Sequence, residues 1–155
     1  MREILFRGKR ADTGDWVKGF YIQKPNPFSE DGKPIRHCII DLFPFGHDVD
    51  PETVGQYTGL TDKNGKRIFE GDVLDLSIIG PDHSMNAVSI EHGAVGFYPL
   101  HPEEEAEEDR RWRSFWEDDE QELWDSKYFT VIGNIHDNPE LLERRRREWR
   151  QKTTF

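Results

Sequence analysis

The sequence is short of cysteine and of long apolar runs. Its 155 residues include one cysteine, Cys38, so no disulfide can form within the chain and no set of thiolates can bind a metal. No stretch approaches the roughly 20 apolar residues that a membrane-spanning helix needs. The N-terminal segment MREILFRGKR carries too many charges for a signal peptide. We therefore expect a cytoplasmic protein without membrane contact, in which Cys38 is a small buried residue.

Apolar residues are scarce as well, at 34% of the chain. The shortfall is offset by 10 Phe, 4 Tyr and 5 Trp, each of which can bury roughly 150–250 Å². A compact core is therefore expected, and it should be rich in aromatic rings. The length suits a single domain, residues 1–155, with two subparts.

The negative charge is concentrated in one segment. The net charge is −10, and residues 103–125 alone contain 12 acidic and 3 basic residues. The rest of the chain is close to neutral. Because binding to a phosphate backbone needs positive charge, we expect no non-specific binding of nucleic acid.

The first subpart, residues 1–60, has the pattern of a β-hairpin region. In EILFRGKRADTGDWVKGFYI, Ile4, Phe6 and Gly8 alternate with charged residues, and a turn follows at residues 12–15. The stretch KPNPFSEDGKP predicts a loop, and residues 37–43 predict a short strand. The next residues predict irregular chain that ends in a helical or 3₁₀ turn at Asp50-Pro51-Glu52-Thr53.

The second subpart, residues 61–137, predicts further hairpins. Asn64-Gly65 is the preferred pair for a two-residue type I′ turn, and RIFEGDVLDLSII should continue from it as one strand that bends at Gly71. Another hairpin should bend at residues 91–93, and residues 127–135 predict a last strand. A helix over 138–150 should begin with Asn138 as its cap and Pro139 in its first turn.

These elements predict a mainly β (α+β) fold. We expect a hairpin-rich, small β-barrel-like core over residues 61–137, of SH3 type, which carries an acidic insert at 102–126. The first hairpin should pack beside this core, and the C-terminal helix should close one end. The glycines at 59 and 65 do not form a phosphate-binding Walker loop, because the spacing is wrong, no Ser or Thr follows Lys66, and a strand follows where a helix is required.

Four blocks of the sequence resemble the YopX family: MREILFRGKRADTGDWVKGFY, VDPETVGQYTGLTDKNGKRIFEGDVL, GAVGFY and VIGNIHDNPELL. Together they cover roughly half of the chain and span it from end to end. The resemblance implies a mainly β fold with a C-terminal helix, and a protein encoded by a bacteriophage or prophage and located in the bacterial host cell. It implies no activity. The segment 102–126 departs from the family pattern.

Two groups of residues are candidates for a small-ligand or hydrolase site. Gln56, Tyr57 and Thr58 lie between two glycines, and side chains on a glycine-bounded turn are natural ligand contacts, although they can equally brace the turn. Glu70 and Asp72 would share one face of a strand about 7 Å apart, a geometry that suits paired carboxylates. The alternative is that Gly71 bends the strand and Asp72 accepts backbone hydrogen bonds.

The remaining polar clusters predict no catalytic or metal site. HDVDPE offers His47, Asp48, Asp50 and Glu52, but it lacks the ordered positions of a calcium loop and is explained by turn chemistry. His136-Asp137 has no nucleophile motif with it. We expect no metal and no cofactor, and an enzyme is less expected than a binding protein.

The acidic segment admits three interpretations. Its aromatic residues recur at roughly helical spacing, so it could be a helix packed on the core, a disordered acidic stretch, or a docking surface that imitates the charge of DNA and acts as a decoy for a DNA-binding host protein. The candidates for partner binding are Trp112, Phe115, Trp116, Glu117, Asp118 and Asp119.

The basic tail around residues 144–147 offers complementary charge. It could complement the helix dipole, pair with the acidic segment of a neighbouring chain to form a homo-oligomer, or bind nucleic acid weakly. The leading functional prediction is a non-enzymatic phage accessory protein that binds a host or phage protein. The alternative is a ligand-binding protein or hydrolase that uses the region from Gln56 to Asp72.

Overall fold

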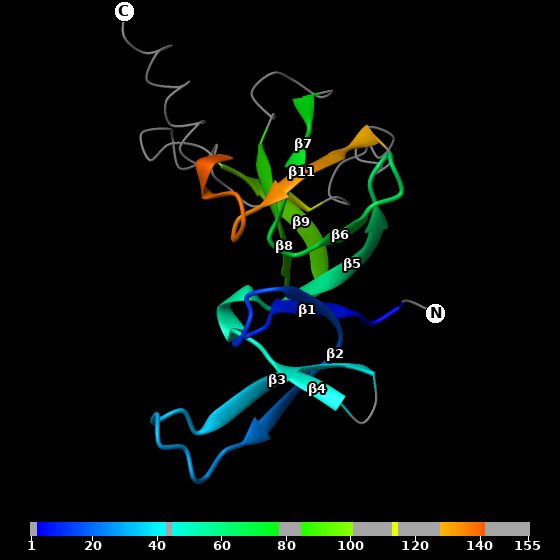
Figure 1. The fold of residues 1–155 in the computed structure, drawn as a ribbon. Helices are drawn as coiled ribbons and strands as arrows, with labels where there is room; N and C mark the ends of the chain where they lie inside the picture. Colours follow the sequence, from blue (N-terminus) through cyan, green and yellow to red (C-terminus); the bar gives the residue numbers. More distant parts are fainter. Residues whose placement is uncertain (1–2, 43–44, 78–84, 101–112, 115–127, 142–155) are drawn as a thin grey trace, which may run out of the picture. The chain divides into compact units, whose positions relative to one another are not determined.

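The computed structural model describes residues 3–42, 45–77, 85–100, 113–114 and 128–141. The chain divides into two compact units, Met1–Gly59 and Leu60–Phe155. The fold is mainly β, with two antiparallel sheets (Figure 1). One sheet has six strands in the order β4-β3-β2-β1-β5-β6, and the other has five in the order β10-β9-β8-β7-β11. The predicted fold class is confirmed at this level.

The N-terminal unit is built from consecutive antiparallel strands. Its elements are β1 (Phe6–Lys9), β2 (Trp16–Pro25), β3 (Ile35–Leu42), β4 (Phe45–Asp48), the 3₁₀ helix η1 (Pro51–Thr53) and most of β5 (Gly55–Thr61). The predicted first hairpin is present, and it pairs Lys9 with Trp16. The prediction of irregular chain was wrong at β4, because pairing with β3 holds this segment extended despite its glycine.

One face of this sheet forms the core of the N-terminal unit. Val17, Ile39 and Val49 are buried there, and Phe6, Tyr21 and Val54 pack around them at partial burial. Gly8 leaves the space that Ile39 fills, since a Cβ at Gly8 would lie 3.1 Å from Ile39 Cδ1. The predicted 3₁₀ turn is confirmed: Asp50 caps η1 by accepting a hydrogen bond from the backbone N–H of Glu52 at 3.1 Å.

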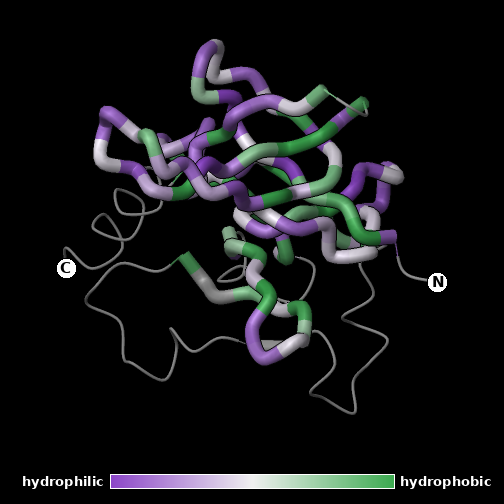
Figure 2. The backbone as a smooth tube through the Cα atoms, turned by 90° about the horizontal axis from the view of Figure 1, so that it is seen from below, coloured by the Kyte–Doolittle hydropathy of each residue, from purple (hydrophilic) through white to green (hydrophobic). Residues whose placement is uncertain are grey.

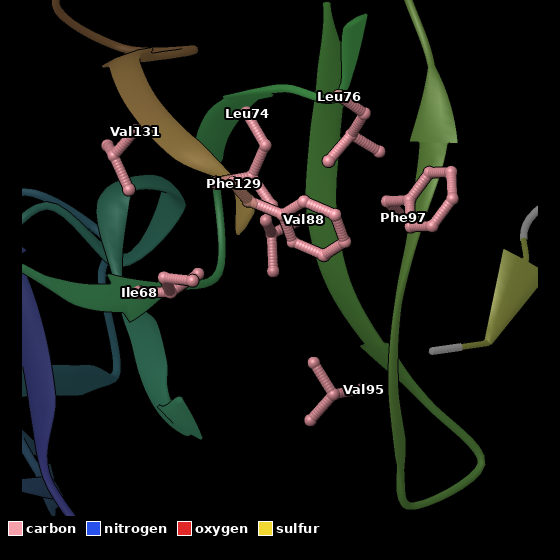
Figure 3. Close-up of a cluster of buried hydrophobic side chains, with 8 residues drawn as sticks. All are labelled: Ile68, Leu74, Leu76, Val88, Val95, Phe97, Phe129 and Val131. Carbon is pink, nitrogen blue, oxygen red and sulfur yellow. The ribbon is translucent and has the colours of Figure 1, made fainter. Parts of the chain in front are cut away.

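The C-terminal unit contains β6 (Arg67–Phe69), which belongs to the six-stranded sheet, and the whole second sheet. The strands of the second sheet are β7 (Asp72–Asp75), β8 (Asn86–Glu91), β9 (Ala94–Pro99), β10 (Arg113–Ser114) and β11 (Thr130–Asn134). Eight buried apolar residues form the core of this unit (Figure 3): Ile68, Leu74, Leu76, Val88, Val95, Phe97, Phe129 and Val131. As predicted, large rings contribute to this core.

The five-stranded sheet is open. Its outer strands are β10 and β11, and within the described residues these two strands do not pair with each other. The prediction of a closed, SH3-type barrel is therefore not supported. The sheet is instead a run of antiparallel hairpins, β7 to β10, onto which β11 returns beside β7.

The type I′ turn lies at a different place from the predicted one. His92 and Gly93, with φ of 51° and 81°, connect β8 to β9 and provide the two positive angles that such a turn requires. At the predicted position only Gly65 has positive φ, 77°. The chain from Asp62 to Lys66 instead forms a three-residue loop, in which Gly65 N–H donates to the Asp62 carbonyl at 2.9 Å.

Two predicted segments fall largely outside the described residues. Residues 139–141 have helical backbone, and the rest of the predicted helix over 138–150 lies outside. In the acidic segment only Arg113 and Ser114 are described. They form β10, so the helical interpretation is wrong at these two residues. No helix in the described part is long and apolar enough to cross a membrane.

Candidate functional site

Gln56, Tyr57 and Thr58 do not form an exposed turn. They lie in β5, where Gln56 pairs with Phe6 of β1 and the backbone N–H of Tyr57 donates to the Leu5 carbonyl at 2.7 Å. The side chains of Tyr57 and Thr58 are buried. The sequence interpretation failed because the two flanking glycines indicated a turn, whereas strand pairing keeps the segment extended.

Glu70 and Asp72 do not share a strand face. Gly71, with φ of 81°, ends β6 and lets the chain turn into β7. The predicted single strand with a bend is therefore two strands that belong to different sheets. Asp72 is fully buried, and its Oδ2 accepts a hydrogen bond from Phe69 N–H at 2.9 Å. Glu70 Oε1 accepts from Ile90 N–H at 3.2 Å. Both carboxylates brace the backbone, in line with the structural alternative.

Asp62 is a structural residue that the sequence interpretation missed. Its Oδ1 accepts the backbone N–H groups of Asn64 and Lys66 at 2.8 and 2.9 Å, which shapes the loop. Its Oδ2 accepts Val131 N–H at 3.1 Å. Burial acts to raise the pKa of Asp62, but these three backbone hydrogen bonds outweigh it and lower the pKa. An Asp two residues before Asn-Gly is a signal of such a loop, because Asp favours hydrogen bonds to nearby backbone N–H groups.

The predicted partner-binding residues lie outside the described residues. Trp112, Phe115, Trp116, Glu117, Asp118 and Asp119 are therefore not placed, and their role stays a prediction.

A cleft of about 930 Å³ lies in the N-terminal unit, between the loop after β2 and the chain around η1. The Arg36–Asp48 ion pair, with Nη2 and Oδ2 2.5 Å apart, lines both this cleft and a neighbouring hollow of about 510 Å³. The thiol of Cys38 donates to the other Asp48 oxygen at 3.1 Å. Cys38 is buried, as predicted.

The groups around this cleft are poorly suited to catalysis. Burial and the hydrogen bond to Asp48 raise the pKa of Cys38, so the thiol stays protonated and is a weak nucleophile. Partial burial would raise the pKa of Asp48, but hydrogen bonds from Arg36 and Cys38 lower it. A general base at neutral pH needs a pKa near 7. These groups therefore favour a structural or binding role.

The histidines near the cleft are paired with neighbouring side chains. His37 Nδ1 and the Tyr21 hydroxyl lie 2.5 Å apart, and their rings stack. His47 Nε2 lies 3.2 Å from Asp41 Oδ2. Across the described ranges, no three His, Cys, Asp or Glu side chains come together in a way that could hold a metal ion.

The strands β2, β3 and β4 carry large exposed apolar side chains. Along β2, Val17 and Gly19 are buried while Phe20 is 67% exposed. The strand register places Phe20 opposite Ile40, and Leu42 opposite Phe45. Leu42 and Phe45 are 71% and 69% exposed. In Figure 2, green apolar stretches and purple polar stretches follow each other along the chain.

We call the side of β2, β3 and β4 opposite the core the outer face. Because side chains alternate along a strand and directly opposite residues share a face, its members are Lys18, Phe20, Ile22 and Lys24 of β2, Arg36, Cys38 and Ile40 of β3, and Gly46 and Asp48 of β4. Leu42 and Phe45 lie beyond a register shift between β3 and β4, at the end of the paired strands. The sequence analysis did not select the outer face. The sequence feature that could have indicated this face is Phe20, a large apolar residue on the same side of β2 as Lys18 and Lys24.

A model of the YopX protein family matches residues 5–143. The chain belongs to the YopX family. The predicted resemblance is thereby confirmed. Among solved structures, the chain is similar to protein EF1440 from Enterococcus faecalis, with 23% sequence identity and a TM-score of 0.46, over 92% of this chain and 99% of that chain. No curated protein matches it. The function therefore has to be argued from the geometry.

Proposed function

We propose that this YopX protein is a non-enzymatic accessory protein of a phage or prophage, and that it acts by binding another protein through its outer face and the adjoining residues Leu42 and Phe45. The observation that carries the proposal is the exposure of Phe20 on the outer face, at 67%, and of the opposed residues Leu42 and Phe45 on the neighbouring strands, at 71% and 69%. Scattered exposed apolar residues are ordinary, but a contiguous group on a regular element is typical of an interaction surface.

The shape of this surface also suits a protein partner. Gly46 leaves room for Ile40, whose Cγ1 would lie 3.2 Å from a Cβ at that position, so Ile40 lies close against β4. Phe20 and Ile40 are directly opposite each other. A regular strand surface with alternating aromatic and aliphatic groups matches the apolar centre of many protein interfaces.

The ligand or hydrolase alternative has less support. It relied on Gln56, Tyr57 and Thr58 as turn residues and on Glu70 and Asp72 as paired carboxylates. Tyr57 and Thr58 are buried in a strand, and each carboxylate accepts a backbone hydrogen bond.

The test combines site-specific cross-linking with a matched control. A photoreactive benzoylphenylalanine at position 20 should cross-link a partner in bacterial lysate, whereas the same group at Phe28, which is 90% exposed in the loop after β2, should not. The purified partner should then bind the triple variant Phe20→Ser, Leu42→Ser, Phe45→Ser at least about tenfold more weakly than the wild type.

The variant Phe28→Ser should bind like the wild type. Circular dichroism and unfolding curves of the triple variant should match the wild type, because the three side chains are mostly exposed. Equal binding by the triple variant and by Phe28→Ser, with the fold intact, would show that the outer face is not the binding surface.

A further inference from the structure

The charges on the outer face are mostly positive. Lys18, Lys24 and Arg36 are exposed, and Asp48 is the one carboxylate on this face. Beyond Lys18, where β2 pairs with β1, the same side of the sheet carries Trp16, with Lys9 Nζ 5.5 Å and Cζ of the buried Arg7 4.7 Å from its ring centroid. The positive charge of this surface contrasts with the net charge of −10 of the chain as a whole.

Two of these cations are directly opposite each other. The register of β2 and β3 pairs Lys24 with Arg36. Like charges at directly opposite positions destabilise a sheet. Arg36 is paired with Asp48 at 2.5 Å, and half of the Arg36 side chain remains exposed, at 52%. Within the described part of the chain, Asp48 is the one carboxylate on this face that offsets the charge of Lys24 and Arg36. A carboxylate from another molecule, placed between Lys24 and Arg36, would therefore reduce the repulsion between these two cations.

We infer that the outer face binds an acidic protein segment whose carboxylates contact Lys24 and Arg36 and whose apolar side chains cover Phe20 and Ile40. This inference rests on the proposed function and adds the chemistry of the partner. Phe20 and Lys24 lie on β2 opposite Ile40 and Arg36 of β3, so one short extended segment can reach both pairs.

A polyphosphate partner fits these observations less well. Nucleic acid binding to a sheet relies on several stacking aromatic rings and many cations, whereas the apolar part of the outer face includes the aliphatic Ile22 and Ile40. The overall charge of −10 also repels a long polyanion. A peptide carries few charges and brings aliphatic side chains to match.

The test is an unbiased selection of peptides. A displayed library of random short peptides is selected on the full-length wild-type protein and counter-selected on the triple variant Phe20→Ser, Leu42→Ser, Phe45→Ser. We expect the selected peptides to share a consensus that contains both acidic residues, Asp or Glu, and large apolar residues. Replacing Glu by Gln in a selected peptide and Lys24→Gln in the protein should each weaken binding several-fold, and the two effects should not add.

Lys63→Gln is the matched control, because Lys63 is an exposed lysine of the other unit. It should leave peptide affinity unchanged. The selected peptides could instead share a neutral or basic consensus and still fail to bind the triple variant. That result would overturn the inferred partner chemistry and leave the proposed function standing. If the selected peptides have no acidic consensus and oligothymidylate displaces them, the outer face is a nucleic-acid surface. That result would also overturn the inference of an acidic protein partner. If no peptide depends on the outer face, both proposals fail.

Discussion

Asp62 and Val131 lie 69 positions apart in the chain, and the backbone N–H of Val131 donates a hydrogen bond to Asp62 Oδ2 at 3.1 Å. One residue further along, Lys63 N–H donates to the carbonyl of Phe129 at 3.0 Å. The loop that follows β5 is thus fixed to the segment that enters β11. A buried carboxylate with three backbone donors fixes both the loop and this long-range contact.

Asp62→Asn should destabilise the protein by about 1–3 kcal/mol, the usual penalty for leaving a buried polar group unpaired. The new amide can keep one acceptor oxygen, but its NH₂ group would oppose an N–H donor at Val131 or in the loop. Urea unfolding measures the loss. Asp75→Asn is the matched control, because Asp75 accepts an exposed hydrogen bond from Ser77 N–H and its loss should have little effect. Equal stability of the two variants would contradict the role of Asp62.

Asp62 should also make stability depend on pH below about pH 4, the ordinary range of an aspartate. Its pKa is lowered in the folded state, because its three backbone hydrogen bonds outweigh the effect of burial. The stabilisation is therefore fully present above the unfolded pKa and is lost as pH falls through the lower folded pKa. The difference in unfolding free energy between wild type and Asp62→Asn should narrow as the pH falls below about 4, the ordinary range of an aspartate. A constant difference across this range would contradict the prediction.

Local patterns in the sequence predicted the hairpins more reliably than the turns. The alternation around Phe6 and Trp16 predicted the first hairpin correctly, because side-chain alternation is a property of the strand itself. Asn64-Gly65 predicted the wrong turn type. Asp62 Oδ1 accepts the backbone N–H groups of Asn64 and Lys66 and shapes a three-residue loop, a local signal that the sequence interpretation missed. The type I′ turn formed at His92-Gly93, where the pairing of β8 with β9 imposes it.

The candidate site was predicted less well than the fold. A sequence shows that Phe20, Leu42 and Phe45 are apolar but not that they stay exposed, since exposure depends on what covers each strand. Lys24 and Arg36 are opposite each other because of the register of β2 and β3, and a sequence does not reveal the register of two strands separated by a loop. Tyr57 and Thr58 were selected as ligand contacts because the flanking glycines indicated a turn, whereas they are buried in a strand paired with β1.

Gly19→Ala should destabilise the N-terminal unit strongly. A Cβ at this position would lie 2.0 Å from the carbonyl oxygen of Ile40, and backbone cannot move aside as a flexible side chain can. We expect a loss of more than about 2 kcal/mol, in the range of severe overpacking. Gly46→Ala is the control, because its Cβ would meet the movable Ile40 Cγ1 at 3.2 Å. Thermal unfolding should show a much larger fall for Gly19→Ala, and equal falls would contradict the close backbone approach.

His92 should tolerate replacement according to the backbone angle it adopts. Its φ of 51° lies in the left-handed region, which asparagine enters more readily than most residues and which β-branched residues avoid. His92→Asn should therefore raise stability by up to about 0.5 kcal/mol, and His92→Val should lower it by about 1 kcal/mol or more. Urea unfolding of the two variants at neutral pH is the measurement. The same stability for both would exclude a type I′ turn as the determinant of this hairpin.

Cys38 should react slowly with iodoacetamide in the folded protein. It is 5% exposed, and burial together with the hydrogen bond to Asp48 raises its pKa, so little thiolate is present at pH 8. Alkylation should be on the order of 100-fold faster in guanidinium chloride, where the thiol is exposed. Asp48→Asn should speed the reaction of the folded protein, because it removes the carboxylate that disfavours a neighbouring thiolate, and should not change the rate in denaturant. A native rate equal to the denatured rate would show that Cys38 is reactive, and would reopen a nucleophilic role for the cleft beside Arg36.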